Sequence, residues 1–256
     1  MRDPSAVLRQ AAVDLDRPGR RAGPRRPPGG IRRAGRPREL WAPLLLITAA
    51  VVYNDWVLEF VLPTGLDARH SYVSELYAAD QPFHAFFGGI EIVAAVLVVA
   101  GALLARRAVP GRLAAAGWWS LVAFGASSVA DVIVPMRCAP SVESPCEAVN
   151  PWHTTTSALV HAALFASMAL LVAAAATGGS PRPLLRRWGP WVLGSALLTA
   201  LATVGPLFGR PGWHGMTQRA HLLLVGVWFV LLAAVLRAAA RRVRPPDEAE
   251  PARASP

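Results

Sequence analysis

Acidic and imidazole side chains stand beside strongly apolar segments in several parts of the chain. Asp131, His153 and His161 form the set best suited to chemistry, because a carboxylate beside imidazoles can move protons or hold a metal ion. Ser74 and Glu75 add a hydroxyl and a second carboxylate. These five residues are candidates for catalysis. The same residue types equally suit hydrogen bonds that hold loops between helices, and the sequence leaves both uses open.

Further ionisable residues suit ligand binding: Asp55, Glu59, His70, Glu91, Arg219 and His221. A charged group in hydrocarbon costs about 2.5–3.5 kcal/mol on insertion scales, so each needs a partner or a function. The i,i+4 spacing of Asp55 and Glu59 predicts one shared helical face. Arg219 is the strong cation of this set, and we expect Asp131 or Glu91 to be its counter-ion.

Zinc is the cofactor that these residue types could bind. His153 and His161 are eight residues apart, which is about 12 Å of helix rise, so one ion does not readily bind both. His221 or His214 could meet one of them, with Asp131 as a third ligand. Such a set is similar to the Ser, Asp and His pattern of seven-span membrane hydrolases of the alkaline ceramidase and progestin-receptor type, although the number of spans and the histidine spacing differ.

Six apolar segments must position these side chains. Each is close to the ~20 residues that a helix needs to cross a ~30 Å hydrocarbon core. Inside that core the backbone must satisfy its own hydrogen bonds, which favours helices. We therefore predict an all-α fold, a six-transmembrane-helix bundle over residues 39–241. Its segments are 41–62, 83–105, 113–135, 152–176, 188–208 and 217–240.

The distribution of arginine predicts the orientation. The chain has 256 residues, is 54% hydrophobic, and carries 26 basic residues, all of them Arg, for a net charge of +10. A pI near 11.3 alone would suggest a nucleic-acid partner. However, 22 of the arginines lie before the first segment, in the second and fourth connections, or in the last turn of the sixth segment and beyond it, and only four lie elsewhere. The positive-inside rule therefore places both termini in the cytoplasm, and we expect no nucleic-acid partner.

The two ends of the chain have a different composition from the bundle. Residues 1–38 are rich in Arg, Pro and Gly, and residues 242–256 are polar and contain Pro. Such segments cannot bury a core, so we predict disordered cytoplasmic tails. The first tail would anchor the topology and attract anionic headgroups.

Cys138 and Cys146 share the connection between the third and fourth segments, on the predicted outer side. Two cysteines in an oxidising compartment indicate a disulfide, which would stabilise so short a loop by about 2–3 kcal/mol. Two unpaired thiols are the alternative.

Residues 66–76, LDARHSYVSEL, resemble the hallmark of a bacterial six-span membrane family catalogued as domain-of-unknown-function family 998. Its members also carry a Phe-Pro-x-Asp-like element after the third span, histidines opening the fourth, and a Gln-Arg pair opening the last. The matches here are residues 134–137, His153 to His161, and Gln218-Arg219, with Arg137 where an acid often occurs. The resemblance covers about residues 40–240. It implies a bundle in the bacterial inner membrane and no agreed activity.

Most of the acids and histidines lie toward the predicted outer ends of the segments, which predicts a polar, outward-facing chamber. We expect an integral membrane protein that acts as an envelope accessory factor or binds lipid headgroups or a membrane protein partner. An outward-facing intramembrane hydrolase or lipid-modifying enzyme, with or without a metal, is the alternative. A small proton-coupled transporter using Asp55 and Glu91 is the third.

The predicted topology can be tested by cysteine accessibility. In cells, a thiol reagent that does not cross membranes should label Val142→Cys, in the third connection, and should not label Val109→Cys, in the second. The reverse labelling pattern would mean that the orientation is inverted.

Overall fold

The computed structural model describes residues 38–106, 111–143, 146, 150–177, 182–205 and 212–243. Its elements are α2 (Arg38–Val52), η1 (Asp55–Phe60), η2 (Val73–Tyr77), α3 (His84–Ala105), α4 (Arg112–Ile133), α5 (Pro151–Thr177), α6 (Pro183–Thr203) and α7 (His214–Val243). The two predicted tails lie outside the described residues, apart from residues 38, 242 and 243, which belong to α2 and α7.

The all-helical membrane bundle is confirmed. Within the described residues, five segments are long and apolar enough to cross a membrane: Trp41–Phe60, His84–Ala105, Arg112–Ile133, Pro151–Thr177 and His214–Arg241. The remaining long helix, α6, corresponds to the fifth predicted segment, and it begins and ends five residues earlier than the predicted 188–208. Its first turn holds Pro183, which suits a helix start, and the helix then continues through Arg186 and Arg187, where hydropathy predicted a loop. Six spans therefore remain a prediction.

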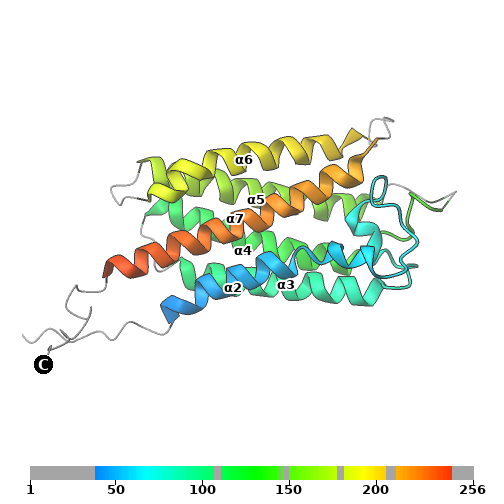
Figure 1. Ribbon diagram of the computed structural model, residues 1–256, viewed down its shortest axis with the longest axis horizontal. Helices are drawn as coiled ribbons and strands as arrows, with labels where there is room; N and C mark the ends of the chain where they lie inside the picture. The colour runs from blue at the N-terminus through cyan, green and yellow to red at the C-terminus, as the bar shows by residue number, and fades with distance from the viewer. Residues whose placement is uncertain are drawn as a thin grey trace, which may run out of the picture. The chain divides into compact units, whose positions relative to one another are not determined.

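The six long helices close into a ring. Each packs against its neighbours in chain order, and α7 returns to pack against α2. Figure 1 shows the helices side by side, with η2 and its flanking loops gathered at one end of the bundle. We call residues 61–83, which run from the end of η1 to the start of α3, the cap segment. The cap segment has its own small apolar core, in which Val73 and Leu76 cluster with Trp56 and Phe87.

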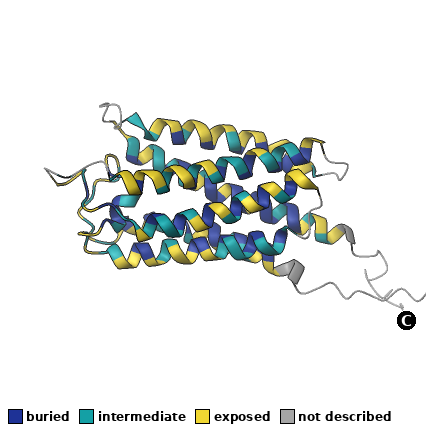
Figure 2. Ribbon diagram, turned by 180° about the vertical axis from the view of Figure 1, so that it is seen from behind, coloured by how far each residue is buried: buried dark blue, intermediate teal, exposed yellow. Residues whose placement is uncertain are grey.

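Buried apolar side chains from all six helices fill the ring away from the cap segment: Leu46, Val98, Leu121, Leu164, Val192 and Leu232 are examples. In Figure 2 the buried positions face the interior of the bundle and the exposed ones face outward. Tyr53, Phe124 and Phe229 form a three-way edge contact in this core, with ring centroids 5.8–6.0 Å apart. Such edge-to-face geometry is favourable for aromatic rings.

The first span changes helix type part-way, which corrects one expectation. The side chain of Asn54 donates to the carbonyl of Ala50 at 2.9 Å and accepts from the indole of Trp56 at 3.0 Å. The chain then continues as the 3-10 helix η1. With three residues per turn in place of 3.6, positions four apart no longer share a face. Asp55 and Glu59 therefore have different surroundings, and the prediction that they lie on one face is wrong.

Close packing between α3 and α4 depends on Gly125. A Cβ at this position would lie 2.6 Å from Val99 Cγ2 and 2.9 Å from the carbonyl oxygen of Ala95. We predict that Gly125→Ala destabilises the protein by about 1–3 kcal/mol, because the backbone oxygen cannot move aside. Thermal unfolding in detergent measures the effect. Gly89→Ala is the control, because nothing lies within 4 Å of a Cβ there. Equal melting temperatures for the two variants would contradict the close approach.

Candidate functional site

A buried ion pair fastens the cap segment to the bundle. Arg219 on α7 is 1% exposed and Glu59 on η1 is 8% exposed. The Nε and Nη2 atoms of Arg219 donate to the two carboxylate oxygens of Glu59, each at 2.5 Å. Its Nη1 donates to the carbonyls of Ala68 and Ser71, both at 2.9 Å. The prediction that Asp131 or Glu91 is the counter-ion of Arg219 is thus wrong. The change from α2 to the 3-10 helix η1 brings Glu59 to the arginine instead.

Gly215 allows the cap segment to approach α7 this closely. A Cβ at Gly215 would lie 2.4 Å from the carbonyl oxygens of both Ala68 and Ser71. One residue before Arg219, Gln218 accepts from the backbone N–H of Val73 at 2.7 Å. The first turns of α7 therefore hold both the loop and η2.

Glu75 joins the cap segment to the disulfide loop. Its carboxylate accepts from the backbone N–H of Tyr72 at 2.7 Å, and from the backbone N–H of Ser141 at 3.1 Å, as well as from the Ser141 hydroxyl. Cys138 and Cys146 are bonded, with Cα atoms 6.1 Å apart, so the predicted disulfide is confirmed. Glu75 is buried in this structural contact and does not line the cavity described next.

A cavity of about 510 Å³ lies between the ring of helices and the cap segment. Of the residues singled out from the sequence, seven line it: Asp55, Ser74, Glu91, Asp131, His153, His161 and His221. Glu59, His70, Glu75 and Arg219 do not line it. Tyr72, Val73 and Tyr77 of the cap segment border it at one end, and Tyr53, at the edge of the aromatic core, borders it too. The cavity is therefore a chamber at the capped end of the bundle.

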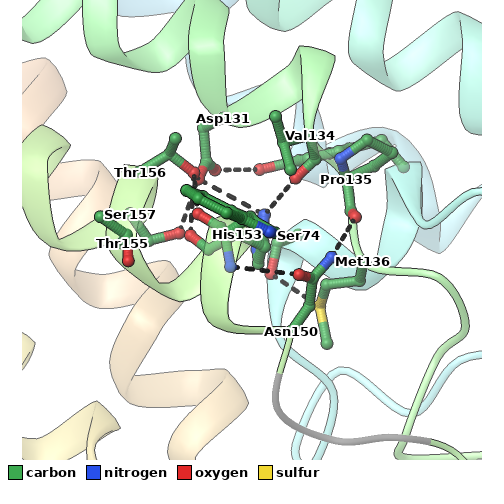
Figure 3. A network of polar contacts seen from close by, with 12 residues as sticks. Ser74, Asp131, Val134, Pro135, Met136, Asn150, His153, Thr155, Thr156 and Ser157 are labelled. Carbon is green, nitrogen blue, oxygen red and sulfur yellow. Dashed lines mark hydrogen bonds and ion pairs between the residues drawn. The ribbon is translucent and has the colours of Figure 1, made fainter.

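Asp131 is the most heavily bonded group of the chamber (Figure 3). Its carboxylate accepts from Thr156 at 2.6 Å and from Ser157 at 2.8 Å, both on α5. Tyr77 of η2 donates to the other carboxylate oxygen, Oδ2, at 3.0 Å. His153 Nδ1 lies 3.4 Å from Oδ1, the oxygen that Thr156 and Ser157 bind. Asp131 thus connects α4, α5 and the cap segment.

Hydrogen bonds at the start of α5 fix the position of His153. Asn150 accepts from the backbone N–H of Trp152 at 3.2 Å, as a capping residue does, and its amide donates to the carbonyl of Pro135 at 3.1 Å. Pro151 occupies the first helical position, which suits its fixed φ. His153 Nδ1 then lies 3.1 Å from the carbonyl of Val134, beyond the end of α4.

His161 and His221 face each other across α5 and α7. Their rings stack with centroids 5.2 Å apart, so His221 does meet one of the two α5 histidines. His161 Nδ1 lies 2.8 Å from the carbonyl of Ser157, and His221 Nδ1 lies 3.0 Å from that of Ala196. Because a carbonyl only accepts, each Nδ1 carries a proton, and Nε2 is the ring nitrogen left to face the cavity.

Two tyrosines of the cap segment remain hydrogen-bond donors over a wide pH range. Burial, and then the charge of Asp131, hold the pKa of the Tyr77 phenol well above its usual range. Burial, followed by the carboxylate of Glu75, raises the pKa of Tyr72 to about 12. Tyr72 donates to the carbonyl of Thr203 at 3.0 Å, so it ties the cap segment to the end of α6.

The model of the family described as protein of unknown function (DUF998) matches residues 46–235. The chain belongs to this family. The predicted resemblance to this family is thereby confirmed. No curated protein and no solved structure matches the chain.

The chamber contacts of this DUF998 protein bear on two catalytic arrangements, a metal centre and a serine nucleophile activated by a histidine. Among the described residues no three His, Cys, Asp or Glu side chains are grouped to hold a metal ion. Ser157 and His153 both contact Asp131, whereas a serine nucleophile needs its hydroxyl on an imidazole nitrogen. Ser74 donates to the sulfur of Met136 at 3.5 Å. These contacts hold helices and loops together.

Sequence reasoning missed three of the groups that complete these contacts. Tyr77 and Thr156 bind Asp131, and Ser141 binds Glu75. Hydroxyl side chains are common, and nothing in their sequence positions links them to carboxylates that lie 25 to 66 residues away.

Removing the carboxylate of the buried pair should destabilise the protein strongly. We predict that Glu59→Ala lowers the free energy of unfolding by about 3–5 kcal/mol, because the Arg219 guanidinium then stays buried without its counter-ion. Thermal unfolding in detergent is the measurement. Glu143→Ala is the matched control, since Glu143 is an exposed acid outside the chamber. If the two variants melted alike, the pair would not be the fastening of the cap segment.

Proposed function

We propose that this protein binds an amphipathic lipid, with the headgroup in the chamber and the hydrocarbon chains in the bilayer beside α5 and α6. The observation that carries the proposal is the two-sided lining of the cavity. Asp55, Glu91 and Asp131 line it from η1, α3 and α4, whereas Leu197 and Leu201 line it from α6. A volume of about 510 Å³ falls in the range of ligand pockets, ~300–1,000 Å³.

The exposure of the α5 and α6 wall supports an opening toward lipid. Leu197 lines the cavity and is 44% exposed, and Leu201 lines it and is more exposed still. On α5, Thr154 and Ala158 also line the cavity and are exposed. Apolar side chains that are exposed and also line a chamber containing carboxyl groups suit a ligand with a polar head and an apolar tail. The seam between α5 and α6 is the route that we assign to the tail.

The contacts of the cap segment favour entry of the lipid from the side, through the bilayer, and not from the membrane surface. Tyr72 is bonded to the end of α6, Val73 to Gln218 and Tyr77 to Asp131. These three contacts anchor η2 over the capped end of the chamber. A lipid that enters from the bilayer would leave all of them in place.

The arginine distribution supports the cellular setting of this proposal. With both termini in the cytoplasm, the capped end and its disulfide loop face outward from the bacterial cytoplasmic membrane. The chamber would then take its ligand from the outer leaflet. An envelope accessory role, in which a lipid is held for a partner protein, is consistent with this arrangement.

Filling the apolar wall should remove the bound lipid. We predict that Leu197→Trp reduces the lipid that copurifies with the protein at least about tenfold, because the indole overfills the chamber wall. Quantitative mass spectrometry of extracted lipid is the measurement. Leu198→Trp is the matched control: Leu198 is the next residue, 70% exposed and outside the cavity lining. Equal lipid content in both variants, with both folded, would refute the proposal.

A further inference from the structure

We infer that the chamber recognises an ammonium group, bound by the carboxyl groups of Asp55 and Glu91 with Ser128 as a further polar contact. The inference names the headgroup chemistry and rests on the proposed function for the apolar part of the ligand. It is argued from the charges, hydrogen bonds and unpartnered groups of the cavity wall.

The described lining carries acids and histidines without a permanently charged cation. Asp55, Glu91 and Asp131 line the cavity, and no arginine is found among its described lining residues. Glu91 lies within electrostatic range of both Asp55 and Asp131. Arg219, the strong cation of this part of the bundle, is committed to Glu59 outside the cavity. A cationic ligand would supply the charge that the wall lacks.

Two of the three acids have free binding capacity. Asp131 already has Tyr77, Thr156, Ser157 and His153 as partners. Within the described part of the chain Glu91 makes no hydrogen bond or ion pair, and Asp55 has only nearby backbone N–H groups. An unpaired acid inside a membrane bundle is costly and is expected to serve a ligand.

The buried hydroxyl of Ser128 points independently to a ligand in the chamber. It lines the cavity from α4, is 1% exposed, and its hydroxyl has no hydrogen-bond partner among the described residues. A buried hydroxyl without a partner costs about 1–3 kcal/mol, so native proteins seldom retain one without a reason. Ser128 lies one turn of α4 from Asp131, on the acidic side of the chamber.

The histidines extend the same acceptor character. Since the Nδ1 atoms of His161 and His221 are bound to carbonyls, the neutral form of each ring presents its lone pair at Nε2. Carboxylates, imidazole Nε2 atoms and a free hydroxyl form a wall rich in acceptors. A primary ammonium provides three N–H donors together with a positive charge, so it complements this wall. An uncharged headgroup lacks the positive charge, and an anionic one is repelled by negatively charged carboxylates.

Chain-matched probes test the inference on the full-length protein. Native mass spectrometry at pH 7 compares dodecylamine, dodecanol and dodecanoate, which share a hydrocarbon chain and differ in headgroup charge. We expect dodecylamine to bind at least about tenfold tighter than the other two. Glu91→Gln and Asp55→Asn should each lower dodecylamine affinity about tenfold and leave dodecanol affinity unchanged. Glu143→Gln, the same exchange at an exposed acid, should change neither.

The outcomes separate this inference from the proposed function. No preference for dodecylamine in the unaltered protein overturns the ammonium site, while loss of copurified lipid in Leu197→Trp would still support lipid binding. Butylamine that binds as tightly as dodecylamine would support the ammonium site and overturn the lipid proposal in favour of a water-soluble amine. The comparison of probes on the unaltered protein needs no variant, so it decides even if a substituted chain fails to fold.

Discussion

The buried pair between Arg219 and Glu59 is the interaction on which the capped end of the bundle depends. A guanidinium has five N–H donors and no acceptor, so it can be buried only where acceptors surround it. Here the carboxylate of Glu59 accepts from Nε and Nη2, and backbone carbonyls of the cap segment and of α7 accept from Nη1. One side chain thus satisfies η1, a loop and its own helix at once.

The chamber is a consequence of this fastening. Because the pair, Gln218 and Glu75 hold the cap segment at its edges, η2 can span the end of the helical ring while side chains below it are left unpacked. Farther along the ring Tyr53, Phe124 and Phe229 pack closely and end the polar region. The cavity lies between these two closures. Its acids come from η1, α3 and α4, and its exposed leucines come from α6, which suits the proposed two-part ligand.

The family hallmark can be interpreted in the same way. Glu75 and the Gln218-Arg219 pair belong to the stretches that resemble family 998, and all three bind the cap segment or the loop beside it. The chamber acids Asp55 and Glu91 lie outside those stretches. Glu75 and Arg219 of these motifs therefore help to build the capped end, whereas Asp55 and Glu91, which keep free binding capacity, carry no motif of their own.

The sequence by itself determined the helical membrane bundle, the disulfide, and the gathering of polar residues at one end, because these follow from segment hydropathy and local composition. The partner of each charged residue was decided only by the tertiary structure. A change to a 3-10 helix after Asn54 separates Asp55 from Glu59 by rotation about the helix axis, so one acid lines the chamber and the other pairs with Arg219. Such a rotation depends on side-chain contacts like that of Asn54 with Trp56, and hydropathy contains no information about it.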